Sequence, residues 1–239
     1  MNHGQLQKQA GEVLPMNSGA VYSSDFYKNQ MNGSLASANS IVPLLIEYVN
    51  PKSVVDVGCG VGTWLSVFEK CGVEILGLDG EYVNKNLLCI AADCFVPTNL
   101  EQVIACDQVF DLAISLEVAE HLSESRAPSF IQELTSLSPV VVFSAAIPKQ
   151  GGVNHINEKW QSYWVNLFGQ YRYLPIDCIR PRVWNCSDIK FWYRQNIILF
   201  CDKTKLIDYP KLLQVFRYTQ EYQCYDLVHP ELFSSLGAR

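Results

Sequence analysis

The sequence predicts an α/β domain whose mostly parallel sheet carries helices on both faces. Apolar, strand-like runs alternate with segments of helical periodicity along most of the 239 residues, as in sheets built from strand–helix–strand units. The first strand-like run ends in three glycines at alternate positions, 58, 60 and 62. A hydrophobic content of 49% with 18% charged residues is ordinary for a globular chain, and this length suits one such domain.

We expect the chain to divide into three parts. Residues 1–33 are rich in Gln, Asn, Ser and Gly, and there we predict a mobile tail followed by a cap segment. Residues 34–202 hold the periodic segments and form the predicted domain. Residues 203–239 are an amphipathic, tyrosine-rich extension that the pattern does not place.

The elements follow from capping, periodicity and breakers. Ser40 suits a helix N-cap before the apolar segment 41–49, where Pro43 falls in the first turn and is tolerated. Apolar and β-branched runs predict strands at 54–57, 73–79, 87–92, 110–116, 139–146, 171–178 and 196–201. Helical spacing predicts helices at 64–68, 127–137 and 158–168.

The glycine segment suits a ligand that lies close to the backbone. Glycine has no Cβ and tolerates positive φ, while the helix that follows offers unpaired N–H groups. A dinucleotide fingerprint needs a third glycine at the sixth position from Gly58, where this chain has Thr63, so a Rossmann oxidoreductase is a weaker interpretation. A purely structural glycine turn is the other alternative.

The spacing Gly-x-Gly-x-Gly, preceded two residues earlier by Asp56, resembles motif I of the class I S-adenosylmethionine (SAM) methyltransferases. The resemblance implies a Rossmann-like, seven-stranded, mostly parallel sheet and SAM as cofactor. The acid Asp79 follows the loop by about the twenty residues that a strand–helix–strand unit places before a ribose-binding carboxylate, although a turn aspartate before a glycine is the alternative. The cofactor-binding residues that we expect are Asp56, Gly58, Gly60, Gly62, Asp79, Asp93 near the adenine amine, and Ser115.

Acidic residues and a histidine follow the 110–116 strand directly. If a helical turn begins at Glu117, the spacing places Glu117, Glu120 and His121 on one side, at the carboxyl end of the sheet. Two carboxylates and an imidazole suit a divalent cation. The alternative is a solvated helix start, where the dipole favours acids.

A second histidine strengthens the cation hypothesis. His155 lies in the loop that leaves the 139–146 strand, and this strand neighbours the 110–116 strand in the expected topology. Together with the Glu-x-x-Glu-His segment it resembles the small-RNA 3′-terminal 2′-O-methyltransferases and the ubiquinone-biosynthesis O-methyltransferases. The resemblance implies that Glu117, Glu120, His121 and His155 are catalytic and hold a divalent metal, which we expect to be Mg²⁺, Mn²⁺, Fe²⁺ or Zn²⁺.

Longer segments are similar to a group of uncharacterised bacterial methyltransferases, whose substrate the resemblance does not supply. These segments are 117–122, 143–148, 150–152, 155–158 and 192–196.

The metal hypothesis points to an acceptor that carries neighbouring oxygens. A dication lowers the pKa of a bound oxygen by many units, and two oxygens on adjacent carbons can chelate it. We therefore expect SAM-dependent O-methylation of a small molecule or sugar with a vicinal diol or catechol. Candidate substrate residues are Gln150, Trp160, Tyr163, Trp184 and Arg194, with core or lid packing as the alternative for the aromatic side chains.

The net charge and the cysteines indicate which partners and which compartment to expect. A net charge of −6 gives no basic footprint, so the sequence does not favour a nucleic-acid partner, although an RNA 3′-end methyltransferase remains an alternative. A SAM-binding module without turnover is the alternative from another class. Nine scattered cysteines without a C-x-x-C pair indicate a reducing cytoplasm. No apolar run reaches the length of a membrane span, so we expect no membrane insertion.

Overall fold

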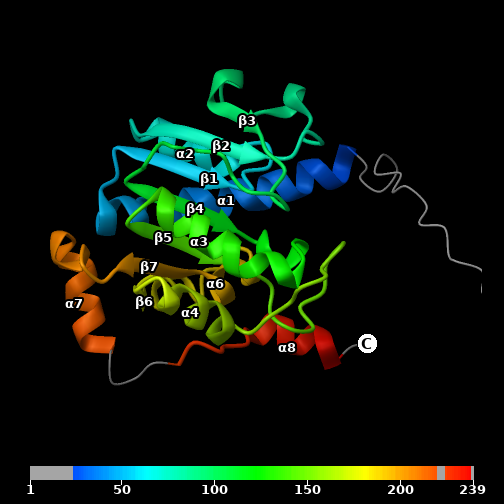
Figure 1. The fold of residues 1–239 in the computed structure, drawn as a ribbon. Coiled ribbons are helices and arrows are strands. Elements are labelled where there is room, and N and C mark those ends of the chain that lie inside the picture. The colour runs from blue at the N-terminus through cyan, green and yellow to red at the C-terminus, as the bar shows by residue number, and fades with distance from the viewer. Residues whose placement is uncertain (1–23, 220–223, 238–239) are drawn as a thin grey trace, which may run out of the picture.

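The computed structural model describes residues 24–219 and 224–237, and it is built around a seven-stranded sheet of order β3-β2-β1-β4-β5-β7-β6 (Figure 1). The five strands from β3 to β5 run parallel, whereas β7 is antiparallel to both β5 and β6. This arrangement confirms the predicted fold class. The strands are β1 (Ser53–Val57), β2 (Glu74–Asp79), β3 (Phe95–Pro97), β4 (Leu112–Leu116), β5 (Val140–Ser144), β6 (Tyr173–Ile176) and β7 (Ile198–Asp202).

Helices connect the strands and cover the sheet. The α-helices are α1 (Ser24–Val49), α2 (Thr63–Lys70), α3 (Ala127–Leu137), α4 (Gln161–Gln170), α5 (Arg180–Val183), α6 (Phe191–Asn196), α7 (Pro210–Thr219) and α8 (Pro230–Gly237). Short 3₁₀ turns are η1 (Lys85–Leu87), η2 (Ala92–Cys94), η3 (Ala119–His121), η4 (Glu124–Arg126) and η5 (Leu206–Asp208). The predicted tail, residues 1–33, lies outside the described residues except for 24–33, which are the start of α1.

The prediction that a helix starts after Ser40 is wrong, because α1 has already run from Ser24 by that point. The Ser40 hydroxyl donates back to the Ala36 carbonyl at 3.2 Å, as a residue inside a helix does. Pro43 lies in the helix interior, where it forfeits one backbone hydrogen bond. The burial of residues such as Ile41 and Leu45, which are 0% exposed, offsets that loss.

The strand predicted at 87–92 is also wrong. Asn84 caps η1 by accepting from the Asn86 amide at 3.0 Å, and the Cys89 N–H donates to the Val61 carbonyl at 2.8 Å. The apolar side chain of Ile90 is buried against Gly62, so this segment packs on the glycine loop and not in the sheet. The strand that pairs with β2 is β3, a few residues later.

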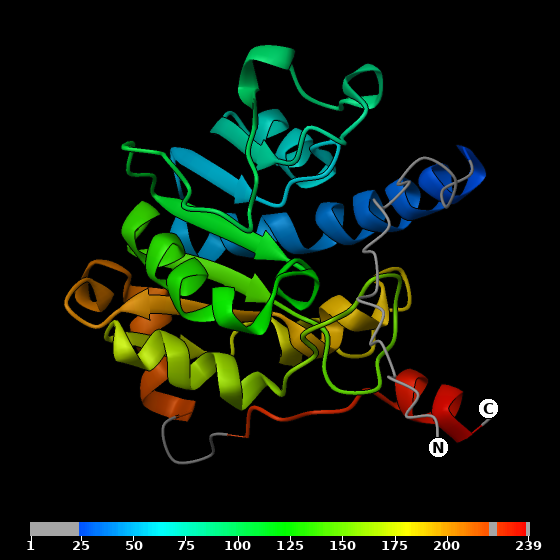
Figure 2. The ribbon, with the colours of Figure 1, turned by 45° about the vertical axis from the view of Figure 1, so that its right-hand side comes forward.

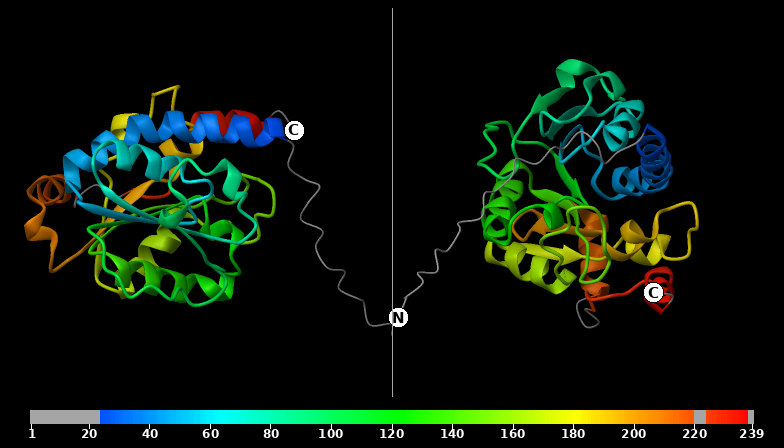
Figure 3. Two further views of the ribbon diagram at one scale, coloured as in Figure 1. Left: turned by 90° about the horizontal axis from the view of Figure 1, so that it is seen from above. Right: turned by 90° about the vertical axis from the view of Figure 1, so that its right-hand side faces the viewer.

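Alternating strand residues bury two cores, one on each face of the sheet. Leu112 and Ile114 of β4 pack in the core beneath α1 and α2, whereas Ala113 packs in the core beneath α3 and α4. Figure 3 shows α1 and α3 on opposite sides of the sheet. None of the described helices is long and apolar enough to cross a membrane.

Candidate functional site

The glycine loop connects β1 to α2 at the carboxyl edge of the sheet. Its three glycines all have positive φ: 92° at Gly58, 54° at Gly60 and 79° at Gly62. A Cβ at Gly58 would come within 2.3 Å of Val118, whereas a Cβ at Gly60 would meet nothing within 4 Å. Gly58 is therefore needed for packing, and Gly60 leaves open room beside the backbone.

Asp79, at the end of β2, faces the glycine loop. Its Oδ2 accepts from the Gly60 N–H at 2.6 Å, while its Oδ1 accepts from the Gly80 N–H at 2.6 Å and from the Tyr82 hydroxyl. Asp56 of β1 is 3% exposed, and burial, then the charge of Asp79, raise its pKa well above the ordinary value of 3.8. These two carboxylates and the loop thus form one corner of the edge, as the sequence indicates.

The other two expected cofactor residues differ in their surroundings. Asp93 is exposed in η2 before β3, and not at the end of a strand. Ser115 is fully buried in β4, and its hydroxyl has no hydrogen-bond partner among the described residues.

Glu117 follows β4 with a left-handed φ of 56°. Its N–H donates to the Ser144 carbonyl at 2.9 Å, so it still pairs with the end of β5, and the following turn contains only residues 119–121. The prediction that a helical turn begins at Glu117 is therefore wrong. Its carboxylate instead accepts from the side-chain amides of Gln150 and Asn196, at 2.9 Å and 3.1 Å.

Glu120 is fully buried, and neither carboxylate oxygen has a hydrogen-bond partner among the described residues. The backbone amides of Glu120 and Ala146 lie near enough to favour the ionised form, although neither has the geometry of a hydrogen bond to the carboxylate. Burial, then the charge of Glu117, raise the pKa of Glu120 well above the ordinary value of 4.5. Burying an ionised carboxylate without hydrogen-bond donors costs free energy. A positively charged partner such as a metal ion would offset that cost.

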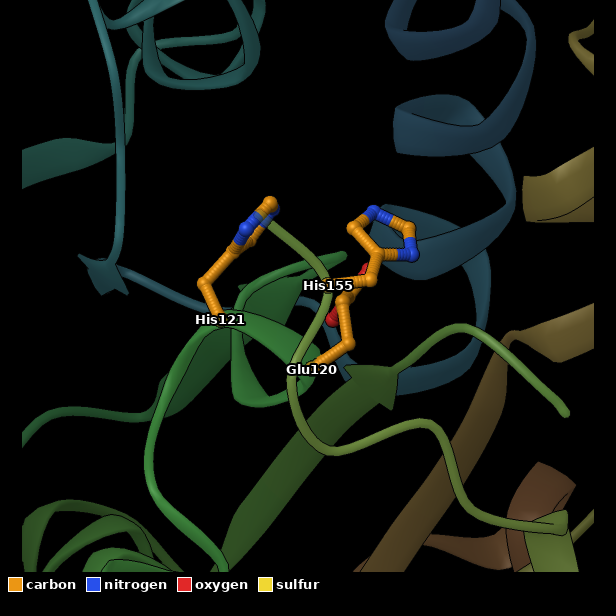
Figure 4. A group of neighbouring side chains, drawn as sticks. All are labelled: Glu120, His121 and His155. Carbon is orange, nitrogen blue, oxygen red and sulfur yellow. The ribbon is translucent and has the colours of Figure 1, made fainter. Parts of the chain in front are cut away.

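Two histidines face this carboxylate. Ligand atoms of Glu120, His121 and His155 all lie within 4.8 Å of one another, and Figure 4 shows the three side chains together, from η3 and the loop after β5. The two imidazole rings are 4.8 Å apart at their centroids and meet edge to face. Burial, then the charge of His155, lower the pKa of His121, which favours the neutral ring that binds a metal ion.

The main chain brings the two segments of the site together. The carbonyl of Glu120 accepts from the N–H groups of Ile156 and Asn157, at 2.9 Å and 3.0 Å. The loop that carries His155 is thereby fastened to the turn that carries His121. The spacing of residues along the sequence does not predict these hydrogen bonds.

Glu158 is a site residue that the sequence analysis missed. Its Oε1 contacts Nδ1 of His155 at 3.0 Å and accepts from the Gly151 N–H at 2.8 Å. Because a carboxylate only accepts, Nδ1 of His155 carries a proton, and Nε2 has no hydrogen-bond partner among the described residues. Nδ1 of His121 likewise faces an acceptor, the Asn154 carbonyl, at 3.3 Å. The i, i+3 spacing of His155 and Glu158 is the signal that could have found this pair.

The expected substrate residues lie in two places. Gln150 lies within the site and contacts Glu117, and Trp160 is 42% exposed just before α4. Tyr163 lies in the first turn of α4, and its ring centroid is 5.4 Å from the Lys159 ammonium nitrogen. Trp184 and Arg194 instead lie toward α8: the Trp184 ring is 4.8 Å from that of His229, and the guanidinium of Arg194 contacts Glu231 and the Trp184 carbonyl.

A family model described as a methyltransferase domain matches residues 30–177. The chain is 27% identical over 176 residues to ubiquinone biosynthesis O-methyltransferase of Rhodopseudomonas palustris (strain BisB18), covering 60% of this chain and 63% of that protein. It is 28% identical over 157 residues to malonyl-[acyl-carrier protein] O-methyltransferase of Buchnera aphidicola subsp. Baizongia pistaciae (strain Bp), covering 61% of each. The matched part thus spans about three fifths of the length of these relatives.

Solved structures share the fold. The methyltransferase domain of bacterial CtHen1-C matches with a TM-score of 0.53 and 22% identity, covering 70% of this chain and 98% of that one. Magnesium protoporphyrin IX methyltransferase (ChlM) from Synechocystis PCC 6803, with bound SAM, matches with a TM-score of 0.54 and 18% identity, covering 77% and 87%. At such identities the likeness concerns the fold alone.

Proposed function

The chain belongs to the class I SAM-dependent methyltransferases, and from that premise we propose that it moves a methyl group from SAM to a hydroxyl held beside a divalent cation. The observation that carries the proposal is the buried, unpartnered carboxylate of Glu120 next to His121 and His155. It lies on the same sheet edge as the glycine loop, where the methyl donor would bind.

The glycine loop and the acids beside it fit SAM. Open room at Gly60 lets the cofactor approach the backbone, and Asp79 can accept hydrogen bonds from the ribose hydroxyls in place of the Tyr82 hydroxyl. We assign cofactor contacts to these residues and to Asp56. We also propose that Asp93 contacts the adenine end of the cofactor and that Ser115 contributes to the cofactor site.

The residues after β4 and β5 fit a divalent metal ion. One carboxylate without a partner and two imidazoles with free Nε2 atoms make a mixed N/O set that suits Mg²⁺, Mn²⁺, Fe²⁺ or Zn²⁺. Glu117 is not in the group of three whose ligand atoms lie together, although its charge raises the pKa of Glu120, and we propose it as the fourth ligand. A dication bound here would lower the pKa of a nearby hydroxyl and offset the negative charge of both glutamates.

We propose that residues of the chain orient the methyl donor and the two imidazoles. Asp79 and the glycine loop hold the donor at one end of the edge, while Glu158 and the Asn154 carbonyl fix the two imidazoles at the other. Transfer breaks the sulfonium C–S bond, forms the O–CH₃ bond and releases the hydroxyl proton to solvent. Holding both partners in line converts a bimolecular reaction into a unimolecular one, which lowers the barrier.

We propose a small molecule or sugar with a vicinal diol or catechol as acceptor. Two curated relatives carry O-methyltransferase names, and Gln150, Trp160 and Tyr163 lie on the elements that carry or follow the His155 loop. An RNA 3′ end is the second candidate, supported by the fold shared with the CtHen1-C domain. The net charge of −6 disfavours RNA, and one of the two lysines in the loop, Lys159, already pairs with Glu124 at 2.8 Å.

We also propose that the protein works in a reducing compartment, the cytoplasm. All nine cysteines lie in the described part of the chain and none forms a disulfide, although Cys71, Cys89 and Cys224 are exposed. Exposed thiols suit a compartment that keeps them reduced.

A transfer screen with methyl-labelled SAM tests the proposed function. Catechols, sugars and short RNA would be compared before chelation, after chelation, and after a divalent ion is added back. We expect label in a diol or catechol class, lost on chelation and restored by the ion. Full activity in metal-free protein would leave only a general-base mechanism, in which His155 takes the hydroxyl proton. Label in RNA alone would favour the second candidate, and no transfer to any acceptor would favour a SAM-binding module without turnover.

A further inference from the structure

We propose that Gln195 is a positioning residue: through Gln150 and Asn196 it holds the carboxylate of Glu117 in one orientation, and it is itself fixed by the C-terminal segment 224–229. The inference depends on the proposed function only for the role given to Glu117. The hydrogen bonds themselves stand without it.

The side-chain amides of Gln195, Gln150 and Asn196 form a hydrogen-bonded series, here called the amide chain, which ends at the carboxylate of Glu117. Nδ2 of Asn196 lies 3.1 Å and 3.3 Å from its two oxygens, and Nε2 of Gln150 lies 2.9 Å from Oε2. An ionised carboxylate only accepts hydrogen bonds, so both amides must present their N–H groups to it. Asn196 is 2% exposed, and water therefore does not replace these donors.

The two amides are oriented in turn by Gln195. Oε1 of Gln150 accepts from Nδ2 of Asn196 at 2.9 Å and from Nε2 of Gln195 at 3.1 Å. The same Gln195 nitrogen donates to Oδ1 of Asn196 at 2.9 Å. The side-chain oxygens of Gln150 and Asn196 thus each have a donor, and the nitrogens of these two amides point toward Glu117.

The other end of the amide chain, away from Glu117, is a backbone N–H group. Gln195 is 0% exposed, and its Oε1 accepts from the N–H of His229 at 2.7 Å. A backbone N–H can only donate, and a carboxylate can only accept. With one obligate donor at one end and one obligate acceptor at the other, every amide between them has a single favourable orientation.

The C-terminal segment is held firmly enough to serve as that anchor. Arg180, which is 1% exposed, donates to the carbonyls of Tyr225 and Gln195 at 2.7 Å and 3.3 Å. Ser162 of α4 donates to both carboxylate oxygens of Asp226, at 2.7 Å from its N–H and 2.8 Å from its hydroxyl. Figure 2 shows the segment, in orange-red, passing along the molecule to α8.

Three of the residues in this set lie outside the part of the sequence that the family model describes. The match ends at residue 177, whereas Asn196, Gln195 and His229 all follow it. The C-terminal extension, which the sequence pattern did not place, therefore has a defined role in the proposal: it sets the orientation of a side chain in the site.

The decisive variant replaces one donor by an acceptor of the same shape. Gln195→Glu puts an oxygen where Nε2 faces the oxygens of Gln150 and Asn196, so the Asn196 amide must turn and its donor to Glu117 is lost. The Ile147 N–H, 3.4 Å from Oε1 of Gln150, still orients that second amide. Gln195→Met removes the same donor without adding a charge, and it serves if the first variant does not fold. The matched control is Gln161→Glu: this buried amide donates to the carbonyls of Gln195 and Leu227, but its side chain does not contact the amide chain.

The first readout needs no metal. Side-chain amide hydrogen exchange would be followed by NMR in the metal-free protein, with exposed Gln214 as reference. In the wild type and in Gln161→Glu we expect the Asn196 amide to exchange at least about tenfold more slowly than the reference. In Gln195→Glu and Gln195→Met the protection should be lost, and wild-type protection in both would overturn the proposal.

The second readout separates the two proposals. If Glu117 is a ligand, Gln195→Glu should weaken Mn²⁺ binding about tenfold, since one misplaced charge-assisted contact is lost, while Gln161→Glu should leave it unchanged. Absence of Mn²⁺ binding in the wild type would reject the proposed metal site, and the amide exchange would still decide the role of Gln195. Equal Mn²⁺ affinity in the wild type and Gln195→Glu, together with wild-type protection of the Asn196 amide, would reject the positioning role.

Discussion

Asp79 and Glu120, which lie in the two halves of the sheet edge, differ in how their carboxylates are satisfied. In the half formed by β1 and β2, Asp79 accepts from the N–H groups of Gly60 and Gly80 and from the Tyr82 hydroxyl. In the half formed by β4 and β5, Glu120 is buried with no donor among the described residues. A carboxylate that already accepts hydrogen bonds can bind a ligand by exchanging one donor for another. A buried carboxylate without donors instead needs a positive charge beside it. On this difference we base the proposal that Asp79 recognises hydroxyl groups and that Glu120 binds a cation.

Glu120→Gln should give the largest effect, because it removes the buried carboxylate to which we propose that the cation binds. Breaking a buried ionic contact costs 3–5 kcal/mol in other proteins, so we expect methyl transfer to fall roughly 100-fold or more. SAM affinity, measured by calorimetry, should stay the same. The control is Glu124→Gln, an exposed acid on the next turn, and an equal loss there would contradict the assignment.

Glu158→Gln should act on the same half through His155. Residues that orient a metal-binding histidine typically change metal affinity 10- to 100-fold, and we expect about tenfold because glutamine keeps the size and one acceptor. A Mn²⁺ titration followed by electron paramagnetic resonance would measure it. If transfer falls while Mn²⁺ affinity is unchanged, Glu158 supports a general base and not a metal ligand.

Gly60→Ala, compared with Gly72→Ala, tests the first half. Both glycines have positive φ, 54° and 77°, and a Cβ at either would meet nothing within 4 Å. Both variants should therefore lose a similar free energy of unfolding, about 1–2 kcal/mol for a left-handed residue. Only Gly60→Ala should also weaken SAM binding, by roughly tenfold, because one lost contact of about 1.4 kcal/mol corresponds to that factor. Equal SAM affinity in the two variants would make the loop a structural turn.

A further expected effect is a change of stability with pH. The pKa of Glu120 is raised in the folded protein above its ordinary 4.5, so between these values the folded state binds more protons than the unfolded state. The free energy of unfolding of the metal-free protein should therefore fall as pH rises above 4.5, by about 1.4 kcal/mol for each unit of pKa difference. Urea denaturation at two pH values would show it. Glu120→Gln should reduce the slope and leave the part due to Asp56, whose pKa is raised as well.

The sequence was sufficient where local pattern decides the structure. Helix α3 spans 127–137 as predicted, because its apolar spacing is regular and Pro128 suits the first turn. The glycine loop and Asp79 lie where motif spacing places them, because the strand–helix–strand unit determines their separation.

The sequence was insufficient where distant contacts decide the structure. The 87–92 run is apolar enough for a strand, but the Val61 carbonyl and Gly62 take its contacts. Glu117 and Asn196 are 79 residues apart, and their hydrogen bond has no signature in spacing. Such pairs appear only once the sheet order brings β4 beside β5 and β7 beside β5.

The most direct test of the difference between the two halves is divalent-ion binding to metal-free protein, in the wild type and in Glu120→Gln. Titration calorimetry with Mn²⁺ would give the stoichiometry and affinity, and thermal unfolding with the ion at 100 times its Kd should add about 2.7 kcal/mol of stability. We expect one ion per wild-type chain, with proton uptake by the buffer because Glu120 must ionise, and at least about 100-fold weaker binding in the variant. No binding in the wild type, or equal binding in both proteins, would contradict a metal site built on Glu120.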